Sequence, residues 1–355
     1  MTSPIVDATP VYAARTGDTL RDRELVLAVW QGALSQGSRL HSMKYEWFHQ
    51  HCPAGPTLLV LIDHRPTNTC VGTSAAGRRR MLWQGHEIHA GVMADMAISR
   101  QHRTLGPVLT LQGKLLDSAA GKFDLLYGFP NAKSIAVAKR AGFPIIGQLR
   151  RYSRILRHGE YLIRVMPPQI ARPMGWLFDV FMDVRRWLRL RIGKRIIVDW
   201  SRSVDPGMDQ LWQESPHGNG LVAVRDSAFL RWRFDEYPGT STRYLYLREQ
   251  PAGPLLAWFA CQTEGTTLYV RDFWSRDAAK GLPRSQIEAL LRSARLDSNA
   301  YSAVSVEYAA AAEKLVGWLA AGFIERAIRS IVGRHLSEAC AHICDLHLTA
   351  ADEDE

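Results

Sequence analysis

The alternation of apolar and polar positions predicts short strands and helices along the chain. Apolar runs at Leu58–Asp63 and Cys70–Ala76 are typical of two strands, and Arg65–Asn68 between them indicates a hairpin turn. The apolar run Glu87–Ser99 predicts a central strand. In Pro107–Ala120, apolar residues recur at the spacing of an amphipathic helix. Up to Leu156 the predicted order of elements is β-α-β-β-β-α-β-α-β.

Four landmarks occur twice, in the same order. They are a Trp-Gln pair, an aromatic segment before a Pro-Gly turn, an aspartate closing an apolar run and a Gly-Phe pair, at Trp30/Trp212, Trp47/Trp232, Asp95/Asp272 and Gly142/Gly322. Solenoid repeats are about 20–50 residues long, whereas this repeat is as long as a domain. We therefore predict two copies of one α/β domain, at residues 1–160 and 195–355, with a linker at 161–194.

Composition narrows the class of protein. Hydrophobic residues make up 46% of the 355 and charged residues 22%, which is ordinary for a globular chain. No run reaches the ~18 apolar residues of a membrane span, and Met1–Pro10 has no signal-peptide pattern. The five cysteines show no paired framework, which favours a reducing cytoplasm. Cys340-Ala-His342-Ile-Cys344 would place three side chains on one face of a strand with no fourth ligand, so we expect no metal site.

Three motifs of the first copy indicate which protein family the chain resembles. Arg103-Thr-Leu-Gly106-Pro-Val108 follows the central strand, Asn131-Ala-Lys-Ser134 opens a later helix, and Arg140-Ala-Gly142-Phe143 ends it. The first resembles the Q/R-x-x-G-x-G/A loop of the GNAT acyltransferase family, which binds the pyrophosphate of coenzyme A, and the others are similar to that family's Asn…Gly-Phe segment. The first copy looks like GNAT enzymes of bacterial surface-polysaccharide clusters. The resemblance covers residues 10–155 by motif and 195–349 by architecture.

This resemblance implies two tandem GNAT-like domains, each with a mixed, mostly antiparallel sheet flanked by helices, and acetyl-CoA or another acyl-CoA as cofactor. A helix N-terminus suits a pyrophosphate through its unpaired amides and partial positive charge, and Gly106 permits close approach. Pro107 removes one amide, and Val108, in place of a second Gly or Ala, would crowd the phosphate. A plain strand-to-helix turn is the alternative. The expected cofactor contacts are Ala97, Ile98, Arg103, Thr104, Leu105, Gly106, Val108 and Asn131.

The matching stretch of the second copy, Arg276–Pro283, lacks this loop pattern, and Asp277 would repel a phosphate. We predict that the second copy has lost the cofactor and forms one wall of a substrate cleft.

The predicted catalytic residues are Asp95, Ser134 and Asn131. Many GNAT enzymes have a tyrosine that acts as general acid, four residues before the Gly of Gly-Phe. This sequence has Ala138 at that position, and the hydroxyl of Ser134 is the proposed substitute. Asp95 is the expected base, with His86 or His89 as alternatives. A purely structural role for Asp95 is equally compatible, because Asp272 repeats it. Trp47 and Trp232 are expected in the core.

The segment 173–195 predicts an amphipathic helix with aromatic residues on one face and a basic C-terminal half. Such a helix either braces the two domains or contacts anionic lipid at the membrane. The net charge of +9 raises nucleic acid as another partner, but no sequence-specific nucleic-acid motif is present. The run Arg78–Arg80 contributes to this charge and is expected in a solvated turn before a strand at Trp83–Ala90.

The sequence therefore predicts a cytoplasmic N-acyltransferase that acts on a small-molecule or lipid-linked amine. The resemblance implies an amino sugar for surface polysaccharide as this amine. The alternatives are an aminoacyl-tRNA-dependent transferase of the same fold and a non-catalytic scaffold at the inner membrane face.

Overall fold

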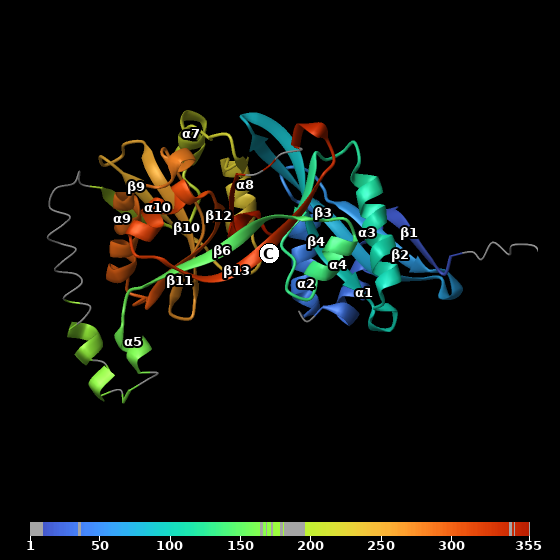
Figure 1. The fold of residues 1–355 in the computed structure, drawn as a ribbon, viewed down its shortest axis with the longest axis horizontal. Helices are drawn as coiled ribbons and strands as arrows, with labels where there is room; N and C mark the ends of the chain where they lie inside the picture. Colours follow the sequence, from blue (N-terminus) through green and yellow to red (C-terminus); the bar gives the residue numbers. More distant parts are fainter. Residues whose placement is uncertain are drawn as a thin grey trace, which may run out of the picture.

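Fourteen strands form one mixed sheet in the computed structural model, counted over the residues that it describes: 10–34, 37–163, 166–167, 169–171, 173–177, 180, 196–340, 343 and 345–354. Across the sheet the order is β1-β2-β3-β4-β5-β13-β6-β12-β11-β10-β9-β7, and β8 and β14 lie off this path. Helices flank the sheet (Figure 1), which confirms the predicted α+β class.

The first half of the chain supplies the strands at one end of the sheet. Its elements are β1 (Tyr12–Gly17), α1 (Arg23–Ala33), α2 (Ser38–Lys44), the π-helical turn η1 (Tyr45–Gln50), β2 (Leu58–His64), β3 (Thr69–Trp83), β4 (His86–Ile98), α3 (Leu105–Ala119), β5 (Leu125–Gly128), α4 (Ile135–Arg140) and β6 (Ile145–Ile155). The apolar positions that predicted α3 do face the core, because Leu111 and Leu115 are fully buried.

The second half repeats this order of elements and adds two short strands. Its elements are β7 (Ile197–Ser201), α7 (Gly207–Glu214), β8 (Leu221–Ala223), α8 (Ser227–Leu230), the π-helical turn η4 (Arg231–Asp235), β9 (Arg243–Arg248), β10 (Leu255–Glu264), β11 (Thr267–Ser275), α9 (Arg284–Leu296), β12 (Ala303–Ala310), α10 (Ala312–Ala320), β13 (Ile324–His335), β14 (Leu346–Thr349) and the 3-10 turn η7 (Ala350–Asp352). That the halves are copies of one domain, and where the domains end, stay predictions.

One long strand of each half, β6 and β13, pairs with strands of the other half. β13 of the second half pairs with β5 of the first, and β6 of the first half pairs with β12 of the second. Between them β6 and β13 pair with each other, antiparallel. Figure 1 shows these two long strands crossing from one half to the other. The largest core cluster accordingly contains buried residues of both halves, including Trp47 and Trp232.

The run Arg78–Arg80 was expected in a solvated turn before a strand at Trp83–Ala90, and this prediction is wrong. The three arginines lie inside β3, which continues to Trp83, and β4 begins at His86. Arg79 is 3% exposed, with its guanidinium 4.8 Å from the centre of the Trp232 ring. The buried arginine is stabilised by an aromatic ring from the other half of the chain, which local sequence does not reveal.

Two further predictions concern the second half and the linker. Cys340 lies in a 3-10 turn, Glu338–Cys340, rather than on a strand, while His342 and Cys344 lie outside the described residues. Most of the predicted amphipathic helix at 173–195, including all of 181–195, also lies outside them. Within the described part of the chain, no helix has the length and apolar character needed to cross a membrane.

Candidate active site

The sheet opens between β4 and β5. These two parallel strands pair only at Ala90–Val92 of β4, and β5 ends at Gly128. Beyond this point the edge of β4 has no strand partner on the β5 side among the described residues. Backbone N–H and C=O groups along such an edge are available to hydrogen-bond a ligand.

A bulge interrupts β4 in this opening. Thr73 of β3 pairs with Ala97, but the next paired residues are Ala75 and Ala94, so Asp95 and Met96 face one residue of β3. Asp95 has a φ of 51°, in the left-handed region. A bulge turns the local backbone away from regular pairing and is common beside active sites.

The carboxylate of Asp95 is buried between two basic side chains. Its Oδ1 lies 2.8 Å from Nζ of Lys44, and its Oδ2 lies 3.0 Å from Nε2 of His49. Burial alone would raise the pKa of Asp95, but Lys44 and His49 outweigh it and hold this pKa well below its usual range. Asp95 is therefore ionised at neutral pH and is a weak proton acceptor.

A cavity of about 440 Å³ occupies the opening. Its lining includes Asp95, Asn131 and Ser134, so the structure brings the three predicted catalytic residues to one cavity. Asn131 Oδ1 accepts hydrogen bonds from the amide and the hydroxyl of Ser134, both at 3.0 Å. Ala138, at the position of the family's tyrosine, also lines the cavity.

The predicted pyrophosphate loop lies outside this cavity, at the start of α3. This helix begins at Leu105, two residues earlier than predicted, so Gly106 and Pro107 belong to its first turn. A side chain at Gly106 would meet no atom within 4 Å, which leaves the backbone accessible. Val108 packs against the core under α3, so its side chain is directed inward. The first turn therefore fits a phosphate ligand despite Pro107.

The remaining predicted cofactor contacts flank this turn. Ala97 and Ile98 are buried in β4, so a ligand would meet their backbone rather than their side chains. Thr104 precedes α3 without a side-chain capping bond. Arg103 donates from Nε to the carbonyl of Ile98 (2.9 Å) and from Nη2 to the carbonyl of Ala33 (2.7 Å), and so braces the loop.

The C-terminal segment supplies residues that sequence reasoning missed. Glu353 and Asp354 line the cavity together with Arg329 of β13. The guanidinium of Arg329 binds both carboxylate oxygens of Glu353, with Nη1 2.8 Å from Oε2. Burial raises the pKa of Glu353, although Arg329 opposes this shift. In the sequence Glu353 and Asp354 belong only to an acidic tail, and no signal connects them to β4.

His41 of α2 is a second missed residue. It lines the cavity and is 1% exposed. Among the described residues, neither of its ring nitrogens has a hydrogen-bond partner. Burial lowers the pKa of His41, so it is neutral at pH 7. A buried imidazole with unmade hydrogen bonds is suited to bind a polar ligand group.

In the second half, the corresponding opening is filled by the chain itself. β11 and β12 pair only as far as Val270 and Val306. Beyond that point β14 takes the free edge of β12, pairing with Tyr308–Ala310. Thr349 then donates from its hydroxyl to Oδ1 of Asp272 on β11 at 2.8 Å.

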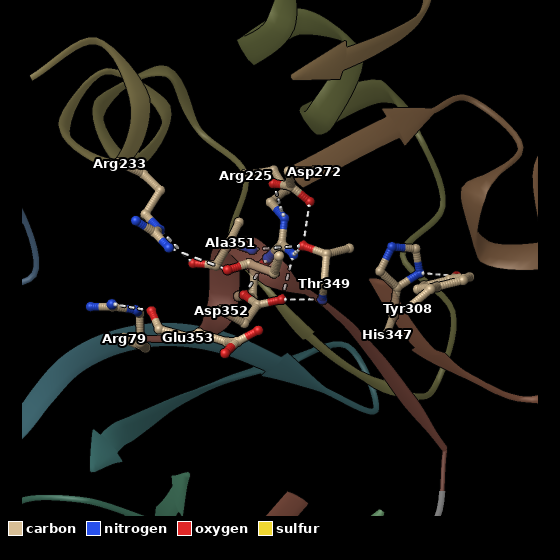
Figure 2. Close-up of polar contacts among 12 residues, drawn as sticks. Arg79, Arg225, Arg233, Asp272, Tyr308, His347, Thr349, Ala351, Asp352 and Glu353 are labelled. Atoms are coloured by element: carbon tan, nitrogen blue, oxygen red, sulfur yellow. Dashed lines mark hydrogen bonds and ion pairs between the residues drawn. The ribbon is translucent and has the colours of Figure 1, made fainter. Parts of the chain in front are cut away.

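A buried ion cluster holds the C-terminal segment, β14 and η7, in this opening (Figure 2). Arg225 binds Asp272 through Nε at 2.8 Å and Asp352 through Nη2 at 2.7 Å, and all three side chains are fully buried. The backbone amide of Thr349 donates to Asp352 at 2.8 Å. Asp272, the counterpart of Asp95, therefore anchors the C-terminal segment.

The loop before α9 is also closed. A side chain at Gly281 would lie 2.8 Å from Cα of Lys314, and one at Gly317 would lie 1.9 Å from the carbonyl oxygen of Leu282. The backbone of α10 thus packs directly on this loop, whereas Gly106 faces open space.

Comparison with known proteins places the fold. No protein-family model and no curated protein sequence matches the chain. A conserved protein from Enterococcus faecalis described as a probable N-acyltransferase superposes with a TM-score of 0.63 at 11% identity, over 92% of this chain and 73% of that one. A GCN5-related N-acetyltransferase from Anabaena variabilis gives 0.63 at 10% identity with the same coverage. N-Myristoyltransferase from Saccharomyces cerevisiae with bound myristoyl-CoA gives 0.52 at 10%, over 94% and 80%. The chain has the α+β fold of the GCN5-related N-acetyltransferases.

Proposed function

We propose that this protein transfers an acyl group from an acyl-CoA to an amine, with the cofactor held by the first half. The observation that carries the proposal is the difference between the two halves: the opening beside β4 is a cavity, and the opening beside β11 is filled by β14. The second half then serves as a structural partner and as one wall of the acceptor site.

The residues present fit an acyl-CoA. The amides of Leu105, Gly106 and Val108 in the first turn of α3 would hold the pyrophosphate, and the edge of β4 beyond the bulge would hold the arm that leads to the cavity. When bound, this cofactor supplies an acyl thioester, whose C–S bond breaks as the C–N bond to the amine forms and whose sulfur leaves as a thiol.

The protein's own part is to move one proton. The amine must lose a proton, and the thiol must gain one. Glu353 is the proposed proton acceptor, because its pKa is raised and it lines the cavity. Ser134, whose hydroxyl is bonded to Asn131, is the proposed donor toward the thiol. The earlier prediction that Asp95 is the base remains to be tested against Glu353.

Calorimetric titration with acetyl-CoA tests the proposal. Wild-type protein should bind at one site per chain, and Gly106→Glu should abolish binding by placing a carboxylate against the phosphates. Gly113→Glu is the matched control, since Gly113 lies on the same helix and a side chain there also meets no atom within 4 Å. Loss of binding in both variants, or in neither, would contradict a site at the N-terminus of α3.

No binding by the wild type would favour the two alternatives, a transferase that uses aminoacyl-tRNA or a non-catalytic scaffold at the membrane. The side chains of Trp176 (63%) and Leu177 (60%) are exposed. This exposure supports the scaffold proposal and a peripheral membrane contact through 173–195. Deletion of Pro173–Lys194 followed by co-sedimentation with anionic vesicles tests that contact. Unchanged co-sedimentation would refute it.

We also propose an amino sugar for surface polysaccharide as the acceptor and the cytoplasm as the location. The motif resemblance of the first half supports the substrate class. Screening amino sugars against amino acids and polyamines, by release of free thiol from acetyl-CoA, tests it. Turnover of polyamines alone would overturn it.

A further inference from the structure

A second cavity adjoins the first. It has a volume of about 410 Å³, within the usual range of about 300–1,000 Å³ for small-molecule sites. Its walls come from the second half, namely from η4 and the turn after it and from β10, β11 and β12. Arg329 and Glu353 line both cavities, so their ion pair lies where the two meet.

The charges around the second cavity are balanced. Its lining contains three arginines and three glutamates. Arg271 binds Glu264, and Arg329 binds both Glu307, at 2.9 Å, and Glu353. The third arginine, Arg233, donates to the backbone carbonyls of Ala351 (2.9 Å) and Ala350 (3.2 Å). A ligand of strong net charge would gain little in such a site, and an apolar ligand would desolvate the ions without replacing their bonds to water.

The uncharged part of the lining has the same polar character. Gln262 accepts from Nε of Arg271 at 3.0 Å and donates to the hydroxyl of Thr242 at 3.0 Å. The ring of Tyr237 adds one apolar face and is packed edge-on against Trp47 at 4.9 Å. A side chain at Gly239 would lie 2.3 Å from the Tyr237 ring, so the ring in this position depends on a glycine there. Alternating donors and acceptors beside an aromatic ring match a ligand that carries many hydroxyl groups.

We infer that this second cavity binds the hydroxyl-rich ring of an amino-sugar acceptor and directs its amine to Glu353, where the two cavities meet. The inference rests on the proposed acyl transfer, and it assigns the acceptor's sugar ring to the second half. The amine then reaches Glu353 from the second cavity. The acyl group reaches the amine from the first cavity.

The matched variants Arg271→Met and Arg243→Met test the inference. The two arginine side chains are 27% and 29% exposed, each pairs with one carboxylate, and each lies over an aromatic ring. Only Arg271 lines the second cavity. With D-glucosamine as acceptor, Arg271→Met should raise KM about tenfold, the effect of losing one charged hydrogen bond, and leave the affinity for acetyl-CoA unchanged. Arg243→Met should change neither.

Binding without turnover separates this inference from the proposed function. Glucosamine and N-acetylglucosamine are titrated into protein without acetyl-CoA, using wild type, both arginine variants and Thr240→Trp. The added indole should fill the cavity from an exposed position without removing a charge. Sugar binding that is weakened in Arg271→Met and Thr240→Trp supports the cavity even if no acyl transfer occurs. Acyl transfer to amines with no sugar binding, or with binding equal in all variants, overturns the inference and leaves the proposed function standing.

Discussion

Trp47 and Trp232 bind each other reciprocally: Nε1 of Trp47 donates to the carbonyl of Trp232 at 2.6 Å, and Nε1 of Trp232 donates to the carbonyl of Trp47 at 2.8 Å. Their rings stack with centres 4.8 Å apart, and both are buried. Arg79 lies over the Trp232 ring at 4.8 Å, and Arg233 lies over the Trp47 ring at 5.5 Å. The contact joins the two halves at equivalent positions of the repeated landmark.

We expect Trp47→Phe and Trp232→Phe each to lower the free energy of unfolding by about 2 kcal/mol, through a lost hydrogen bond and lost packing. Because the two rings contact each other, the double variant should lose less than the sum of the single variants. Denaturant unfolding followed by circular dichroism measures both effects. A shared core also predicts one transition, and two separate transitions would refute this coupling of the halves.

Replacing Asp95 with Asn should destabilise the fold by about 3 kcal/mol, because the half-buried Lys44 and the fully buried His49 lose the charge of the carboxylate between them. Asn tolerates the left-handed backbone of this position, so Asp95→Ala should cost about 1 kcal/mol more. The low pKa of Asp95 means that its contribution is present above its unfolded pKa near 3.8 and falls as the pH drops below that value. Melting temperatures of wild type and Asp95→Asn should therefore converge in acid. A constant difference at every pH would contradict the ion pair.

Glu353→Gln should lower kcat about 10²- to 10⁴-fold, the usual loss on removing a general base. In the wild type, kcat/KM should rise with pH through a pKa above the ordinary 4.5 of glutamate, because burial raises the pKa of Glu353. The variant should lose this rise, which a pH–rate profile measures. Glu325→Gln, at an exposed carboxylate paired with Arg150, is the control. If the rise of kcat/KM with pH is absent in Asp95→Asn and present in Glu353→Gln, Asp95 is the base.

Asp272 and Asp352 share Arg225 but should differ in their importance for stability. Burial, aided by Asp352, raises the pKa of Asp272 to about 6 against the attraction of Arg225. Because the pKa of Asp272 is higher in the folded than in the unfolded protein, its protonated form stabilises the fold. This contribution to the free energy of unfolding is complete below the unfolded pKa near 3.8 and is lost as the pH rises through about 6. Asp272→Asn should therefore cost less than about 1 kcal/mol at pH 7.

Asp352→Asn should cost about 3 kcal/mol at the same pH, because it removes the negative charge opposite the buried Arg225. It also replaces one of the two oxygens that accept from Arg225 and from the Thr349 amide with an NH₂ group, which cannot accept. Chemical unfolding of both variants at pH 5 and pH 7 tests the difference. Equal losses at pH 7 would show that the two carboxylates are equivalent.

Local pattern was sufficient for most elements. The strand predicted at Leu58–Asp63 agrees with β2 except for one residue at its end, and the helix predicted at Pro107–Ala120 agrees with α3 within two residues at each end. Both follow from the spacing of apolar residues within the element itself. Burial of Trp47 and Trp232 was also predicted correctly. The arginines of β3 were misplaced, since three consecutive arginines indicate solvent unless a distant aromatic ring is known to cover one of them.

The sequence by itself determined most of the strands and helices and the repeated landmarks, and the resemblance of its motifs grouped Asp95, Asn131 and Ser134 as one candidate site. Only the tertiary structure decided that β6 and β13 pair across the halves, that β14 fills the opening of the second half, and that Glu353 lines the cavity of the first. The physical reason is that residue periodicity encodes which face of an element is buried. The strand or side chain that covers the face depends on contacts between residues far apart in the chain, such as Arg225 and Asp352.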